Sequence, residues 1–85
     1  MHTQEQISQT IRQFIIDNVF GGKDDPNLTN ETSLISSRVM DSIVALKLVS
    51  HLETIYGFEF AANEVTQENL ESISVLTAFV QSKLK

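Results

Sequence analysis

The feature that most constrains the fold is the spacing of apolar residues, which follows the turn of an α-helix in three separate segments. In the first segment the apolar residues are three or four positions apart, with one adjacent pair: Ile7, Ile11, Phe14, Ile15 and Val19. An α-helix turns once every 3.6 residues, so this spacing places them on one face. We therefore predict a helix over residues 4 to 20, ended by Gly21 and Gly22.

The second helical segment begins after Asp41 and ends at Gly57. Asp41 has the short acceptor side chain that is favoured at a helix N-cap, which puts Ser42 in the first helical position. Glycine is the usual residue just past a helix end. At 100° per residue, one arc of about 120° forms the predicted core face. It contains Ala45, Leu48, Val49, Leu52, Ile55 and Tyr56.

The third segment follows Ser72, another residue type that suits an N-cap. Its apolar residues again repeat at three and four: Ile73, Leu76, Phe79, Val80 and Leu84. Lys83 and Lys85 complement the negative end of this helix dipole. Before it, we predict a short helical turn around residues 65 to 70. Phe58-Glu59-Phe60 is too short and isolated for a stable strand and is interpreted as an apolar linker.

The connection between the first two helices is long, with Pro26 and many Asn, Asp, Thr and Ser residues. We predict a structured loop, held to the core by apolar side chains at intervals: Leu28, Leu34, Ile35, Val39 and Met40. The fold class is therefore all-α, with three main helices and one short helix. A chain of 85 residues is sufficient for a single domain, residues 1–85.

Charge and composition narrow the possible partners and locations. The net charge of −5 would repel nucleic-acid phosphates and anionic lipids, and it favours docking on a basic protein surface. The apolar runs are far shorter than a membrane span, and the N-terminus lacks the pattern of a signal peptide. The absence of cysteine is consistent with a cytoplasmic location.

The sequence contains no recognisable motif of an enzymatic site or a metal site. The two histidines, His2 and His51, are far apart and no thiol accompanies them, so no metal site is predicted. His51 follows Ser42 by nine residues and lies about 180° around the helix, so the two cannot form a catalytic dyad. A hydrolase would need a base supplied from the loop. We predict that the protein is not an enzyme.

Ser42 has surroundings that suit a phosphate group. Backbone N–H groups and the helix dipole stabilise negative charge at a helix N-terminus. Ile43 and Leu46 lie outside the predicted core arc, which leaves apolar side chains exposed near Ser42. Each of these features alone is common, because serine often begins helices and single surface aliphatic residues are frequent.

Together these residues resemble the acyl and peptidyl carrier proteins. The family's Asp-Ser-(Leu/Ile) motif and its continuation correspond to Val39-Met40-Asp41-Ser42-Ile43, Leu48-Val49, Leu52-Glu53 and Tyr56-Gly57-Phe58-Glu59-Phe60. The family's third-helix signature is similar to Glu64-Val65-Thr66-Gln67-Glu68-Asn69-Leu70-Glu71-Ser72-Ile73. The resemblance covers residues 5 to 84, and the ordered set of motifs is far more specific than a three-residue match.

The resemblance implies a right-handed four-helix bundle of acyl-carrier type and a monomer. A phosphopantetheinyl transferase would use coenzyme A and magnesium to attach 4′-phosphopantetheine to Ser42. The thiol of that arm would carry acyl or aminoacyl thioesters between enzymes: an adenylating or acyl-loading enzyme, a condensing or acyl-transferring enzyme, and a thioesterase. Asp41 would be the acidic residue that the transferase recognises, beside its role as an N-cap.

The resemblance also assigns the outer side of the second helix to partner docking. The residues concerned are Ile43, Val44, Leu46, Lys47 and His51. Lys47 and His51 also fit ordinary solvated surface side chains. Arg38 is interpreted as a surface side chain too, with the prosthetic phosphate as a candidate partner.

Two departures from the family pattern bear on the pathway. Carriers of primary fatty-acid synthesis have a strongly acidic second helix, whereas here only Glu53 is acidic, and the usual glycine before the Asp-Ser pair is absent. These departures favour a specialised nonribosomal-peptide or polyketide-like pathway. The alternatives are a general fatty-acid carrier, a D-alanyl-type carrier, and an unmodified helical adaptor between proteins.

Overall fold

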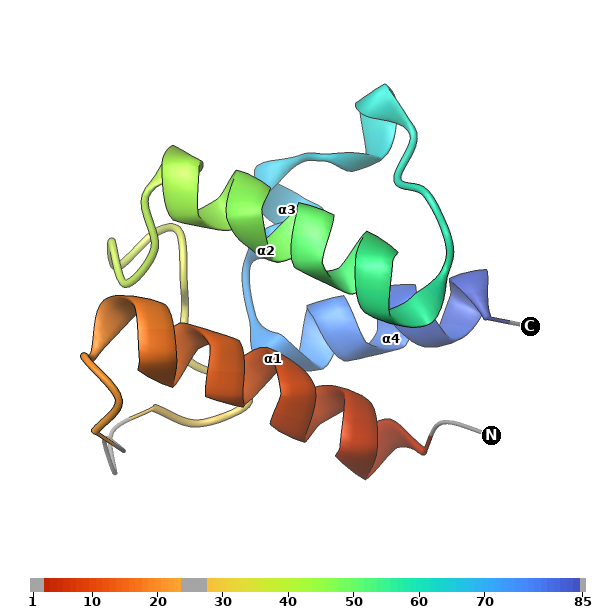
Figure 1. Ribbon diagram of the computed structural model, residues 1–85. Coiled ribbons are helices and arrows are strands. Elements are labelled where there is room, and N and C mark those ends of the chain that lie inside the picture. Colours follow the sequence, from red (N-terminus) through yellow and green to blue (C-terminus); the bar gives the residue numbers. More distant parts are fainter. Residues whose placement is uncertain (1–2, 24–27, 85) are drawn as a thin grey trace.

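The fold is described by a computed structural model that covers residues 3–23 and 28–84. It comprises α1 (Gln4–Val19), α2 (Ser42–Tyr56), the 3₁₀ helix η1 (Ala62–Glu64), α3 (Gln67–Leu70) and α4 (Ile73–Lys83). Across these two ranges no residue is in a strand, which confirms the all-α prediction. α1 packs most closely against α4, α2 runs alongside α1 in the opposite direction, and α3 lies between η1 and α4 in the chain (Figure 1).

The helix ends follow the cap residues of the sequence. Asp41 accepts a hydrogen bond from the Val44 N–H at 2.8 Å, and Ser72 accepts one from the Val75 N–H at 3.1 Å. Gly57 ends α2 with a φ of 69°, a left-handed conformation that glycine adopts without steric penalty. The predicted caps of α2 and α4 are therefore confirmed, and Ser42 is the first residue of α2.

The core contains most of the residues of the predicted apolar faces. Buried side chains come from every α-helix: Ile7, Ile11, Ile15, Ile16, Ala45, Leu48, Val49, Leu52, Leu70, Ile73, Leu76 and Val80. The prediction for Ile55 is wrong, because 45% of this residue is exposed. Ile55 lies at the edge of the predicted arc, in the last turn of α2. One turn earlier this edge is covered by α1, where the Phe14 and His51 rings meet at a centroid distance of 4.9 Å.

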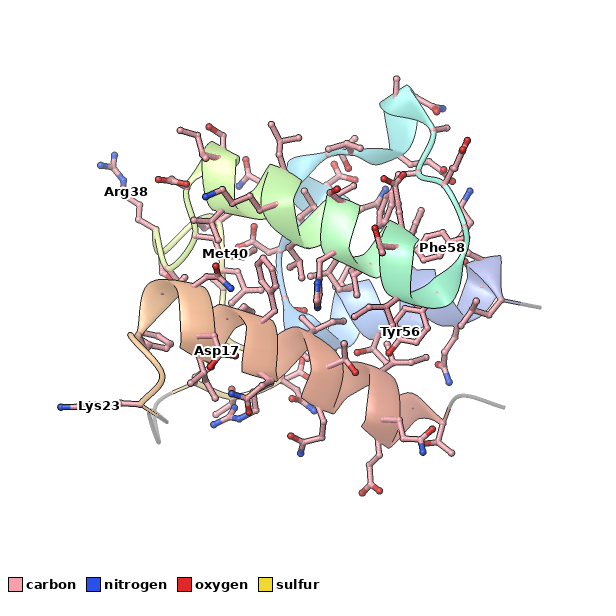
Figure 2. The ribbon with its side chains drawn as sticks, in the orientation of Figure 1. Asp17, Lys23, Arg38, Met40, Tyr56 and Phe58 are labelled. Atoms are coloured by element: carbon pink, nitrogen blue, oxygen red, sulfur yellow. The ribbon has the colours of Figure 1, made fainter. Side chains whose placement is uncertain are left out.

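The loop before α2 is held to the core as predicted. Leu28, Leu34 and Met40 are buried, and Ile35 and Val39 pack partly against the core. Met40 points inward between α1 and α2 (Figure 2). The Leu34 N–H donates to the Glu71 carbonyl at 2.6 Å, which joins the loop to the residue that follows α3. Pro26 of this loop and Lys85, which was predicted to complement the dipole of the last helix, lie outside the described residues.

The segment between α2 and α4 is more helical than the sequence pattern indicates. Phe58-Glu59-Phe60 is irregular, as predicted, but η1 follows it without a corresponding prediction. Phe60 stacks on Phe79 of α4 at a centroid distance of 4.8 Å. Lys83 forms an ion pair with Glu64 at 2.7 Å, so it attaches η1 to α4 in addition to being near the helix C-terminus. Within the described ranges, no helix is both long enough and apolar enough to cross a membrane.

Candidate functional site

The site is centred on Ser42, whose side chain is exposed at the N-terminus of α2. The preceding residue, Asp41, uses one carboxylate oxygen to accept from the Val44 N–H, and its carbonyl accepts from the Ala45 N–H at 3.0 Å. No hydrogen bond joins the Ser42 hydroxyl to another described residue. The hydroxyl is therefore accessible to an external enzyme, at a position where the helix dipole favours an attached anion.

A groove of about 260 Å³ opens beside Ser42. One wall comes from the first turns of α2 and the other from the segment around α3, with Ile35 of the long loop between them. The lining is Ile35, Ser42, Ala45, Leu46, Val65, Thr66, Gln67 and Leu70. Because most of these side chains are apolar, the groove suits an apolar ligand or chain.

Hydrogen bonds join the long loop to the α3 side of this groove. The Ser36 N–H donates to a Glu71 carboxylate oxygen at 3.3 Å, and the Gln67 amide donates to the Ser36 hydroxyl at 3.1 Å. Interaction with Ser36 lowers the pKa of Glu71 below its ordinary value, because a hydrogen-bonded carboxylate is stabilised in its charged form. The loop residue Ile35 is thereby kept next to α3.

The five predicted docking residues divide into two groups. Ile43 and Leu46 are 64% and 58% exposed, and Lys47 is exposed on the same side of α2. Val44 is only partly exposed, because it packs against the core. His51 is also partly buried, with its ring against Phe14, so it is not the fully solvated histidine that the sequence suggested.

Arg38 adopts a backbone conformation that sequence analysis did not anticipate. Its φ is 62°, in the left-handed region, and its N–H donates to the Ile35 carbonyl at 3.0 Å. The side chain is exposed and points away from the bundle (Figure 2). Glycine is the residue that adopts this conformation without strain. Arg38 thus holds a left-handed conformation in the segment before Asp41, where the sequence lacks the family's usual glycine.

Other groove residues were not assigned to the site from the sequence. Ile35 was predicted only as a core anchor, and Val65, Gln67 and Leu70 only as parts of a short helix or turn. Their joint lining of the groove depends on how the loop and α3 meet in space. In the sequence, the apolar Val65 and Leu70 flank polar residues. This pattern indicates a short helix with one buried side, but it does not indicate which element that side faces.

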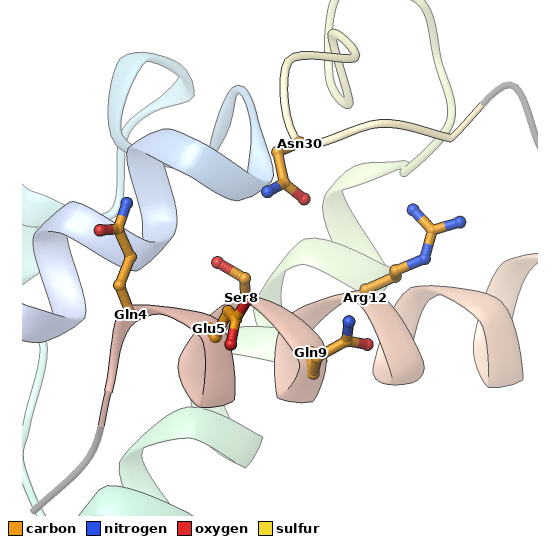
Figure 3. A pocket seen from close by; sticks show the side chains of 6 residues that line it. All are labelled: Gln4, Glu5, Ser8, Gln9, Arg12 and Asn30. Carbon is orange, nitrogen blue, oxygen red and sulfur yellow. The ribbon is translucent and has the colours of Figure 1, made fainter.

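A second pocket, of about 290 Å³, is polar (Figure 3). It is lined by Gln4, Glu5, Ser8, Gln9, Arg12 and Asn30. Two of these side chains already have structural partners: Ser8 shares a hydrogen bond with Thr77 at 2.9 Å, and Arg12 donates to the Leu28 carbonyl. In the part of the chain that the structure describes, no group of three or more His, Asp or Glu residues is arranged to hold a metal ion. Ser42 and its groove therefore remain the candidate site.

Comparison with known proteins adds no assignment. No protein-family model matches the chain, and no curated protein matches it.

Proposed function

We propose that this chain is an acyl or peptidyl carrier protein of acyl-carrier fold, in which Ser42 bears 4′-phosphopantetheine. The observation that carries the proposal is the exposed Ser42 hydroxyl, without a partner among the described residues, at the start of a 15-residue helix and on the rim of an apolar groove. The motif resemblance around Asp41 and Ser42 independently supports the same residue.

The residues around Ser42 fit such a group. A phosphodiester on the hydroxyl would carry its negative charge at the positive end of the α2 dipole. Arg38 and Lys47 are exposed cations four residues before and five residues after Ser42. The groove offers an apolar surface to the arm or its cargo. When attached, the arm supplies the thiol that carries acyl or aminoacyl groups as thioesters.

The surroundings of Ser42 support a carrier role more than hydrolysis. His51 packs against Phe14 of α1, and it lies about 180° around α2 from Ser42. A general base must come within hydrogen-bond reach of the hydroxyl that it activates. We therefore propose that loading and transfer are catalysed by partner enzymes. The exposed face of α2, with Lys47 and no acidic side chain after Ser42 until Glu53, favours a specialised pathway over primary fatty-acid synthesis.

The test is intact-protein mass after incubation with coenzyme A, magnesium and a broad-specificity phosphopantetheinyl transferase. We expect a gain of one phosphopantetheinyl group in the wild-type chain and none in Ser42→Ala. Ser50→Ala is the matched control, because Ser50 is also an exposed serine of α2, and it should be modified normally. No gain in a folded wild-type chain would leave the unmodified helical adaptor as the better assignment.

The same assay separates two roles of Asp41. Asn caps a helix about as well as Asp, so Asp41→Asn should keep the stability of the wild type, whereas Asp41→Ala should lose about 1 kcal/mol. If the transferase recognises the carboxylate, Asp41→Asn should be modified roughly tenfold more slowly, since hydrogen bonds to charged groups are worth about 1.5 to 3 kcal/mol. Equal modification rates for Asp41→Asn and wild type would leave the N-cap as its role.

A further inference from the structure

The chain as a whole is acidic, but the outward side of α2 carries a basic side chain close to Ser42. The net charge is −5, which by itself predicts attraction to a basic partner. The exposed outward side of α2, however, carries Lys47 between Ile43 and Ser50, and the loop before Asp41 adds Arg38. Two of the six basic side chains of the sequence therefore lie within five residues of Ser42.

Several acidic side chains of α2 and of the segment after it are engaged with the protein itself. Glu53, in the third turn of α2, accepts from the Phe60 N–H at 2.8 Å. Glu71 accepts from the Ser36 N–H at 3.3 Å, and Glu64 pairs with Lys83 at 2.7 Å. Asp41 is exposed, but its carboxylate caps α2, where the helix dipole offsets its charge. Glu68 of α3, the helix on the opposite side of the groove, is exposed.

The centre of this surface is apolar. Ile43 and Leu46 are the two most exposed large apolar side chains among the described residues, and Leu46 also lines the groove. Apolar side chains at the centre and charged side chains at the rim are the usual arrangement of a protein interface. Charges at the rim select the partner by sign and steer its approach.

We infer that the enzymes which serve Ser42 dock through an apolar depression that receives Ile43 and Leu46 and is edged by carboxylates facing Lys47 and Arg38. The inference rests on the proposed function only in taking Ser42 as the centre of the interface. The net charge of the chain suggests a basic partner, whereas this inference gives a partner with acidic edges. Complementarity depends on the sign of the charge at the contact surface. An anionic lipid surface is disfavoured, since two cations on a chain of net charge −5 give little attraction to it.

The test uses the unmodified full chain labelled with ¹⁵N and two synthetic helical peptides of about 18 residues, or five turns. Both peptides carry the same Leu and Ile stripe, flanked in one by Glu and in the other by Lys. At low ionic strength we expect the Glu peptide to bind about tenfold more tightly and to shift the amides of residues 42–50. Arg38→Glu/Lys47→Glu should reverse the preference.

Lys23→Glu is the matched control, because Lys23 is an exposed lysine beyond the end of α1 (Figure 2). It should leave the preference for the Glu peptide unchanged. Tighter binding of the Lys peptide to the same amides, or shifts confined to other residues, would overturn the inference. So would binding to phosphatidylglycerol vesicles without binding to either peptide. The titration needs no prosthetic group, so its failure beside a positive mass assay would leave the carrier assignment intact.

Discussion

At the scale of single residues, the start of α2 concentrates features that are individually ordinary. Asp41 ends the loop and caps the helix, Ser42 presents a hydroxyl at the positive end of the dipole, and Ile43 exposes an apolar side chain beside it. Immediately before them, Arg38 holds a left-handed backbone conformation. A residue other than glycine costs roughly 1 to 2 kcal/mol there, so Arg38 marks the strained point of the turn into α2.

Substitution of Arg38 tests this strain. In Arg38→Gly, the relief of roughly 1 kcal/mol of strain offsets the roughly 0.5 to 1 kcal/mol by which glycine's freedom stabilises the unfolded chain. We expect a free energy of unfolding within about 0.5 kcal/mol of the wild type. Arg38→Val should lose about 1 to 2 kcal/mol, because a β-branched residue tolerates a positive φ poorly. Urea unfolding of the three proteins provides the measurement.

Equal destabilisation by glycine and valine would contradict this account. It would show that the Arg38 side chain itself stabilises the loop, although it is exposed and points away from the bundle.

At the scale of elements, the helices were predictable and the groove was not. The spacing of Ile7, Ile11 and Ile15 indicates the buried side of α1, because a continuous apolar stripe must face a core. The caps at Asp41 and Ser72 were also predictable, since their side chains act on backbone groups only three residues away. By contrast, Leu46 and Val65 meet in one groove through packing between distant segments, which no local pattern records.

Ile55 shows the limit of a helical wheel within a correctly predicted helix. The wheel gives an angle around α2, but burial also depends on which element covers that angle at that height along the helix. Phe14 covers the edge at His51, and Ile55 one turn later remains 45% exposed.

A pair of alanine variants in α2 measures this difference. Leu52→Ala removes a fully buried side chain and should lower the free energy of unfolding by about 2 to 5 kcal/mol through lost burial and a new cavity. Ile55→Ala should cost less than about 1 kcal/mol, because much of its surface is already in water and alanine favours the helix. Chemical denaturation monitored by circular dichroism gives both values. A loss at Ile55 as large as that at Leu52 would show that the end of α2 is more tightly packed than described.

At the scale of the whole molecule, polar contacts join segments that are far apart in the sequence. Thr77 of α4, which is buried, shares a hydrogen bond with Ser8 of α1 at 2.9 Å. Glu64 pairs with Lys83 and attaches η1 to α4, while Glu71 attaches the end of α3 to the loop through Ser36. Two of these three connections depend on an ionised carboxylate, so the stability of the assembled bundle is linked to pH.

The direction of this linkage follows from the two pKa values. Hydrogen bonding to Lys83 lowers the pKa of Glu64, and hydrogen bonding to Ser36 lowers that of Glu71. Both groups therefore favour the folded state when ionised. Their contribution is fully present above their ordinary pKa of 4.5 and is lost as the pH falls through the lowered folded pKa values.

We therefore predict that the stability difference between the wild type and Glu64→Gln/Glu71→Gln depends on pH. The wild type should be more stable at pH 7, and the difference should shrink as the pH falls below about 4.5. As the pH falls, protonation of the other carboxylates relieves repulsion in this acidic chain. This effect is the same in both proteins, so comparing them removes it. The control variant is Glu59→Gln/Glu68→Gln, which removes two exposed charges. Its stability difference from the wild type should not shrink in this way as the pH falls. Thermal unfolding between pH 3 and pH 7 provides the measurement, and a difference that stays constant over this range would mean that neither carboxylate stabilises the fold through its charge.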